Sequence, residues 1–116
     1  MTELWCWRCQ HEMPMLDEDE WPEMAAALRR GIRNIKARRQ ATGASLAEVT
    51  EGDKLQAQYA EALDLYEQLT GYRETNPLAL HHHRVSIYGP PCQTCAKPLR
   101  TPKAKLCAAC GARRAV

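Results

Sequence analysis

The sequence predicts a mainly α-helical protein with small β elements held by metal, in which a helical hairpin precedes a cysteine-rich C-terminal segment. Two amphipathic stretches in the middle of the chain predict the hairpin. Three Cys-x-x-Cys pairs, which hold all six cysteines, lie outside those stretches and predict metal-held elements at both ends. We therefore expect one compact unit with three parts: an N-terminal knuckle (1–16), a helical hairpin core (17–84) and a C-terminal metal ribbon (85–116).

The first part begins with a tryptophan-flanked cysteine pair, Trp5-Cys6-Trp7-Arg8-Cys9. A proline-containing turn at Met13-Pro14-Met15 follows it closely. This pattern predicts a small β-hairpin folded over a metal ion.

The first predicted helix runs from about Glu20 to Gln40. Asp17 or Asp19 is placed to cap it, and Thr42-Gly43 supplies a stop. Its large apolar residues recur at spacings of 3, 4, 4 and 3, which makes one apolar stripe: Trp21, Met24, Leu28, Ile32 and Ile35.

The second predicted helix follows the capping-box sequence Ser45-Leu46-Ala47-Glu48, continues to about Leu69 and is closed by Gly71. Gly52 leaves open whether an early helical turn is separate from the main helix. The apolar stripe of this helix consists of Leu55, Tyr59, Ala62, Tyr66 and Leu69. Two such stripes are expected to pack as an antiparallel pair.

Shorter elements connect the hairpin to the tail. Asn76-Pro77 has the form of an N-cap followed by a first-turn proline, which predicts a short helical turn through His81-His82-His83. The alternation of Val85-Ser86-Ile87-Tyr88 predicts a brief strand, and Gly89-Pro90-Pro91 ends it.

The C-terminal tail contains two Cys-x-x-Cys pairs separated by eleven residues. Each pair directs two thiolates at one point, and two pairs complete the tetrahedron that zinc prefers. The predicted ligands are Cys92, Cys95, Cys107 and Cys110. Four protein ligands leave no open position, so the expected role of this zinc is structural; free or redox-active thiols are the alternative. Residues 92–111 resemble the zinc-ribbon family, which implies a metal and a local shape.

Cys6 and Cys9 form a half-site that needs two further ligands. The candidates are His11 and the run His81, His82 and His83, among which His82 and His83 are the expected pair. A second zinc there would clamp the hairpin from both ends. The alternatives are a thiol pair in the core beside the two tryptophans, or cysteines that share ligands with the tail.

The net charge of +2 conceals four blocks of alternating sign. Residues 1–23 carry a net charge of −6, residues 24–40 of +6, residues 41–76 of −5 and residues 77–116 of +7. Such blocks pair with one another in the fold or present charged faces to a partner.

The sequence carries no recognisable catalytic apparatus. No phosphate-binding glycine loop, nucleophile elbow or carboxylate pair occurs, and no histidine stands two positions before a glutamate as in zinc deaminases. We therefore expect a protein that is not an enzyme. The chain also shows no secretion signal and no apolar run near 20 residues, so we expect a soluble cytoplasmic protein that does not enter a membrane.

Two functions remain. An acidic surface on a rigid scaffold favours a protein that binds and inhibits a protein partner, through Asp17, Glu18, Asp19 and Glu20. Small bacterial proteins associated with toxin–immunity loci resemble this chain at 76–84, 88–92 and 97–102. That resemblance implies an immunity protein that neutralises a cognate antibacterial toxin or effector, such as a nuclease. The alternative is a zinc-ribbon nucleic-acid-binding or transcription/translation accessory protein, which the basic blocks favour.

Overall fold

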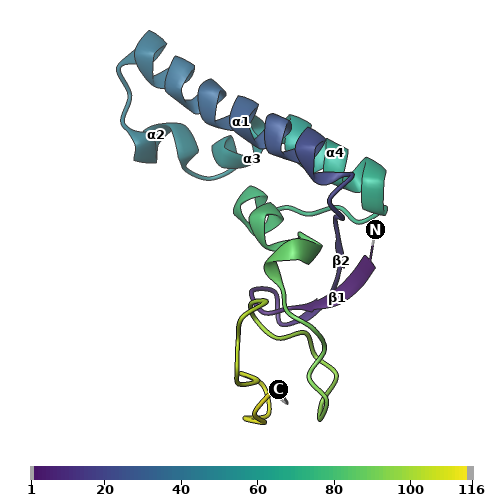
Figure 1. Cartoon of the computed structure of the whole chain (residues 1–116). Helices are drawn as coiled ribbons and strands as arrows, with labels where there is room; N and C mark the ends of the chain where they lie inside the picture. The colour runs from purple at the N-terminus through teal and green to yellow at the C-terminus, as the bar shows by residue number, and fades with distance from the viewer. Residues whose placement is uncertain (1, 115–116) are drawn as a thin grey trace.

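The computed structural model describes residues 2–114 and shows an elongated molecule of 54 × 26 × 20 Å. About 46% of the chain is helical. A helical arm forms one end, the N-terminal hairpin lies in the middle, and the cysteine-rich tail forms the other end (Figure 1). Residues 1, 115 and 116, the outermost positions of the predicted knuckle and ribbon, lie outside the described residues.

The N-terminal segment forms the predicted β-hairpin. Strands β1 (Thr2–Cys6) and β2 (His11–Met15) pair antiparallel, with Cys6 opposite His11. The turn between them contains Cys9, so one cysteine of this pair ends a strand and the other lies in the turn.

Helix α1 (Trp21–Thr42) lies close to its predicted bounds, and Gly43 ends it in a left-handed conformation. The predicted capping role of Asp17 or Asp19 is wrong in its details, because the N-cap residue is Glu20 and no side chain caps it. The carboxylate of Asp17 instead accepts hydrogen bonds from the backbone N–H groups of Asp19 and Glu20, and so closes the turn before the helix.

The apolar stripe of α1 is confirmed except at Ile32. Met24 and Leu28 are buried, whereas Ile32 is 54% exposed. The line of contact with the second half of the hairpin passes through Ala27 and Gly31, which are both buried, and this leaves Ile32 on the flank of the stripe.

The second arm consists of three pieces, α2 (Leu46–Thr50), α3 (Lys54–Gln58) and α4 (Ala60–Thr70). The separate early turn that Gly52 left open is present, whereas the further break at Tyr59 was not predicted. The break between α2 and α3 contains Gly52, whose φ of 56° lies outside the helical region. The predicted capping box of Ser45 is present, and so is the closing glycine after α4.

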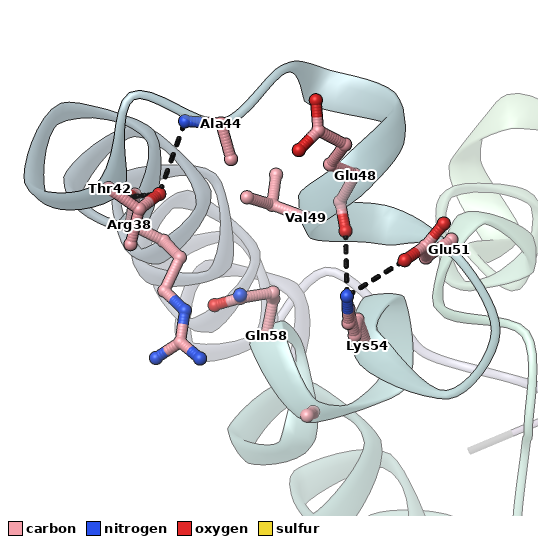
Figure 2. Close-up of a pocket in the computed structure, with 9 residues that line it drawn as sticks. Arg38, Thr42, Ala44, Glu48, Val49, Glu51, Lys54 and Gln58 are labelled. Carbon is pink, nitrogen blue, oxygen red and sulfur yellow. Dashed lines mark hydrogen bonds and ion pairs between the residues drawn. The ribbon is translucent and has the colours of Figure 1, made fainter.

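A hollow separates the end of α1 from α2 and α3 (Figure 2). Lys54 closes one side of it, because its ammonium group donates hydrogen bonds to the Glu48 carbonyl and the Glu51 carboxylate. Val49 is buried beneath α2 and is the apolar residue that holds this helix against α1.

Gly31 allows the close contact between the two arms of the hairpin. A Cβ atom at this position would overlap the ring of Tyr59, which joins α3 to α4. We expect Gly31→Ala to lower the free energy of unfolding by about 1–3 kcal/mol, since it overpacks this contact. Urea unfolding followed by circular dichroism measures the change, and Arg33→Ala on the exposed side of α1 is the control. A gain of about 1 kcal/mol, as a glycine-to-alanine change gives in an uncrowded helix, would contradict this packing.

The segment after the hairpin departs from prediction in one element. The 3₁₀ helix η1 (Pro77–His82) begins with the predicted Asn76 cap. The strand predicted over 85–88 is wrong, because a second 3₁₀ helix, η2 (Val85–Ile87), occupies it. The extended pairing occurs one residue earlier, where Arg84 bridges Leu16 in parallel, and the chain then turns.

Buried apolar residues form three separate clusters. The largest lies within the helical hairpin, and the other two surround the N-terminal and C-terminal cysteines. The C-terminal cluster has only Leu99 as a fully buried aliphatic residue beside its cysteines. Packing of this size stabilises a fold weakly, so the tail needs another source of stability.

Within residues 2–114, no helix has both the length and the apolar character that crossing a bilayer requires.

Candidate metal centres

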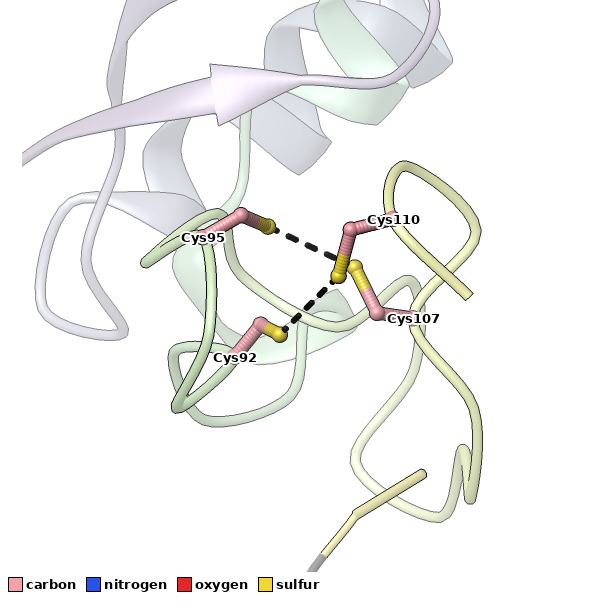
Figure 3. A group of neighbouring side chains, drawn as sticks. All are labelled: Cys92, Cys95, Cys107 and Cys110. Atoms are coloured by element: carbon pink, nitrogen blue, oxygen red, sulfur yellow. Dashed lines mark hydrogen bonds between the residues drawn. The ribbon is translucent and has the colours of Figure 1, made fainter. Parts of the chain in front are cut away.

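The four C-terminal cysteines converge in the arrangement that metal binding requires. Their sulfur atoms all lie within 4.8 Å of one another (Figure 3). Cys92 Sγ is 3.7 Å from Cys110 Sγ, and Cys95 Sγ is 3.6 Å from Cys107 Sγ. A tetrahedron with metal–sulfur bonds of about 2.3 Å has edges of about 3.8 Å, whereas a disulfide places its sulfurs about 2.0 Å apart. The group is therefore suited to one metal ion and not to disulfides.

All three cysteine pairs close the same turn. The residue four positions after the first cysteine has a left-handed backbone: Gln10 (φ 61°), Ala96 (φ 67°) and Gly111 (φ 78°). The N–H group of that residue donates to the carbonyl of the first cysteine at 2.8, 2.8 and 2.9 Å, respectively. The chain thus builds one knuckle three times, although the three sequences share little besides the cysteines.

Ala96 is strained in this turn, because a side chain with a Cβ atom disfavours left-handed backbone. We expect Ala96→Gly to raise the free energy of unfolding by about 1 kcal/mol, since glycine adopts this conformation without steric cost. Thermal unfolding of the metal-loaded protein measures the gain. Ala108→Gly is the control, because Ala108 is exposed, lies between Cys107 and Cys110 and has no positive φ. Equal destabilisation by both changes would contradict the assignment of strain to Ala96.

The second group consists of Cys6, Cys9 and His83, whose ligand atoms also lie within 4.8 Å of one another. Cys6 and His83 are completely buried. His83 Nε2 is 3.3 Å from Cys9 Sγ. The structure thus brings one of the two expected histidines to this pair, and among the described residues neither His82 nor His11 joins the group.

The position of His83 is fixed by backbone pairing with Leu16, the residue that follows strand β2. Leu16 donates its N–H to the His83 carbonyl at 2.8 Å, and its own carbonyl accepts from the Val85 N–H at 2.9 Å. The Tyr66 ring lies 5.4 Å from the imidazole, and its hydroxyl donates to the buried Pro14 carbonyl. The candidate centre therefore joins the N-terminal hairpin to the segment that follows α4.

The adjacent histidines have other surroundings. The His82 carbonyl accepts a hydrogen bond from the Tyr88 hydroxyl, and His81 is exposed. Neighbouring residues in a tight 3₁₀ turn project in different directions, so one of the three faces the cysteines. The sequence shows that three histidines are adjacent, but it does not show which of them faces the cysteines.

The two centres differ in how their thiols ionise. Backbone N–H groups of Cys95 and Thr94 donate to the Cys92 sulfur and lower its pKa to about 6. The N–H of Cys110 likewise lowers the pKa of Cys107. Burial instead raises the pKa of Cys9 to about 12. Within the same group, burial and the neighbouring thiols raise the pKa of Cys110 to about 11. The protein itself therefore favours thiolate at Cys92 and Cys107, whereas thiolate at Cys9 or Cys110 requires a nearby cation.

The acidic segment predicted to contact a partner has internal interactions. Both carboxylate oxygens of Glu18 accept hydrogen bonds from Arg84, at 3.0 and 2.9 Å, and this contact lowers the Glu18 pKa. The Glu20 carboxylate accepts from the Asp17 backbone N–H at 3.0 Å. With Asp19 in the same turn, the segment fastens the start of α1 to the residue that follows His83.

Two contacts between the ends of the chain were not foreseen. The Lys97 ammonium group lies 3.9 Å from the centre of the Trp5 ring, and the Arg100 guanidinium lies 5.9 Å from that of Trp7. The Trp7 indole N–H also donates to the Pro98 carbonyl at 3.0 Å. Tryptophans and basic residues therefore interleave in space, although the sequence alone separates them by about ninety positions.

The chain matches no protein-family model, no curated protein and no solved structure. Its function is accordingly inferred from the chemistry of its own residues.

Proposed function

We propose that this protein is a non-enzymatic binding protein whose fold is fastened by zinc at both cysteine centres. The observation that carries the proposal is the C-terminal group, whose sulfur–sulfur separations of 3.6 and 3.7 Å fit the edge of a zinc–thiolate tetrahedron. Soft thiolate ligands in tetrahedral array favour zinc over magnesium, calcium or manganese. The tail is then a zinc ribbon in which the metal supplies the stability that its small apolar cluster lacks.

The N-terminal centre supports a structural role as well. Within residues 2–114 the group offers three ligands, and the buried Glu74 carboxylate, which helps to raise the pKa of Cys9, is not a member of it. Cys6 and His83 are fully buried. A zinc ion there would hold the hairpin against the helical core instead of meeting a substrate.

Hydrogen exchange with and without a strong chelator tests this role. We expect metal removal to abolish protection of the amides in 89–114 and in the β1–β2 hairpin. Helices α1 and α4 should keep their protection, because their apolar cluster is separate from both cysteine groups. Unchanged protection throughout the metal-free chain would overturn the proposal.

The partner that we propose is a protein, bound by the helical arm. Ile32 and Leu46 are 54% and 53% exposed. Both line a second hollow at the free end of that arm, which is not the one drawn in Figure 2. Exposed apolar residues gathered in this way mark protein contact sites. An immunity protein that neutralises a bacterial toxin, which the sequence resemblance implies, is the specific form of this proposal.

Co-purification with the product of a neighbouring gene, and rescue of cells from that product, test the immunity function. We expect Ile32→Glu combined with Leu46→Glu to abolish the complex. Asp19→Lys, a charge reversal in the exposed part of the acidic segment, tests whether the partner binds that segment instead of the helical arm. Loss of the complex in Asp19→Lys alone would place the contact at the acidic segment instead of the hollow.

A further inference from the structure

We infer that the cysteine-bearing end of the molecule binds single-stranded nucleic acid in a pocket between the N-terminal knuckle and the tail. This inference goes beyond the proposed function, because the pocket is lined by residues of the N-terminal knuckle, of the segment 82–88 and of the tail, and the tail lies at the other end of the molecule from the helical arm (Figure 1). The two ligands would occupy separate surfaces.

The pocket has a volume of about 300 Å³ and combines aromatic with cationic side chains. It is lined by Trp7, Arg8, His82, Ile87, Tyr88 and Arg100. Two guanidinium groups provide bidentate donors for phosphate oxygens. The half-buried indole of Trp7 provides a surface on which a base stacks, and such stacking contributes about 1–3 kcal/mol per base. The phenol of Tyr88 is buried and lines the pocket without offering such a surface.

The charge around the pocket favours a polyanion over a small anion. Residues 77–114 contain seven lysines and arginines and no acidic residue. Among the described residues, only Arg84 of these cations forms an ion pair with a carboxylate, that of Glu18. Four thiolates on one zinc ion carry a charge of −2, which offsets two of the remaining six cations. A net charge of +4 is left on the tail, where Arg100 lines the pocket, and such a charge can follow several phosphates of a strand that extends from the pocket.

The backbone at this end favours a single strand over a duplex. An α-helix or a two-stranded ribbon can enter the major groove of duplex DNA. The β1–β2 hairpin is such a ribbon, but it contributes to the pocket its turn residues Trp7 and Arg8 and not its strands. Residues 88–114 form turns and isolated bridges only, at Pro91 with Pro98 and at Leu106 with Arg113. A splayed base can reach the indole of Trp7, whereas a stacked and paired base cannot.

Fluorescence anisotropy of labelled 12-nucleotide single strands with the full-length, zinc-loaded protein tests the inference. We expect Arg8→Gln combined with Arg100→Gln to weaken binding at least tenfold. The slope of log K against log salt should fall by about 1.4, since each phosphate contact to a single strand contributes about 0.7. Arg29→Gln combined with Arg33→Gln removes two exposed charges from α1 and should leave affinity unchanged.

A second pair of variants isolates the stacking contribution. Trp7→Phe keeps an aromatic ring and should retain most of the affinity, whereas Trp7→Leu should lose it; zinc content and circular dichroism confirm that each variant is folded. The inference is overturned if the labelled single strands do not bind, if the two arginine pairs weaken binding equally, or if Trp7→Leu binds as well as Trp7→Phe. Equal affinity for a duplex or for a polyglutamate peptide would also overturn it.

Discussion

Replacement of Cys107 by serine should release one zinc ion and unfold the C-terminal ribbon. This thiol is 1% exposed and completes the four-sulfur group. Structural zinc contributes about 10–16 kcal/mol to the stability of small zinc-dependent folds, far more than the cluster around Leu99 supplies by packing. We expect limited proteolysis to cut Cys107→Ser within 89–114, while helical circular dichroism remains near that of the unmodified protein.

The control for this change lies in the other C-terminal knuckle. Gln93 is exposed between Cys92 and Cys95, so Gln93→Ser alters the turn without removing a ligand. We expect it to retain all its zinc and its resistance to proteolysis. Protease resistance in Cys107→Ser equal to that of Gln93→Ser would show that the ribbon does not depend on metal.

Replacement of His83 by alanine should strongly destabilise the contact between the β1–β2 hairpin and the helical core. This side chain is fully buried and aims Nε2 at Cys9. Its removal deletes one of the three ligands proposed for a metal and leaves a cavity beside Tyr66. Loss of a metal together with a cavity destabilises a protein by more than about 4 kcal/mol. Urea unfolding monitored by tryptophan fluorescence reports this loss directly, because Trp5 and Trp7 lie in the hairpin.

The two neighbouring histidines provide matched controls. His81→Ala changes an exposed side chain and should shift stability by no more than about 0.5 kcal/mol. His82→Ala keeps the carbonyl that accepts from Tyr88 and should keep both zinc ions. If His82→Ala loses a zinc ion while His83→Ala keeps both, the assignment of His83 as the ligand is wrong.

The sequence predicts well those features that depend on neighbours along the chain. The Ser45 capping box, the Asn76 cap and the glycine that ends α1 are all present, because each depends on groups within a few residues. The N-terminal hairpin and the convergence of the four C-terminal cysteines follow from equally local patterns.

Features that depend on tertiary pairing were predicted less well. The strand expected over 85–88 is absent because Leu16 pairs with the backbone at Arg84, and no local pattern encodes that register. The same pairing selects His83 over His82 as the neighbour of Cys9. The contact between Lys97 and Trp5 likewise depends on the fold, so the sequence alone hides the mixed aromatic and basic surface.

Native mass spectrometry of the purified protein tests most directly whether zinc occupies both cysteine centres. We expect a mass that corresponds to two zinc ions per chain, reduced to one in Cys107→Ser and to one in His83→Ala. A folded, metal-free chain whose six cysteines all react with an alkylating reagent would contradict it.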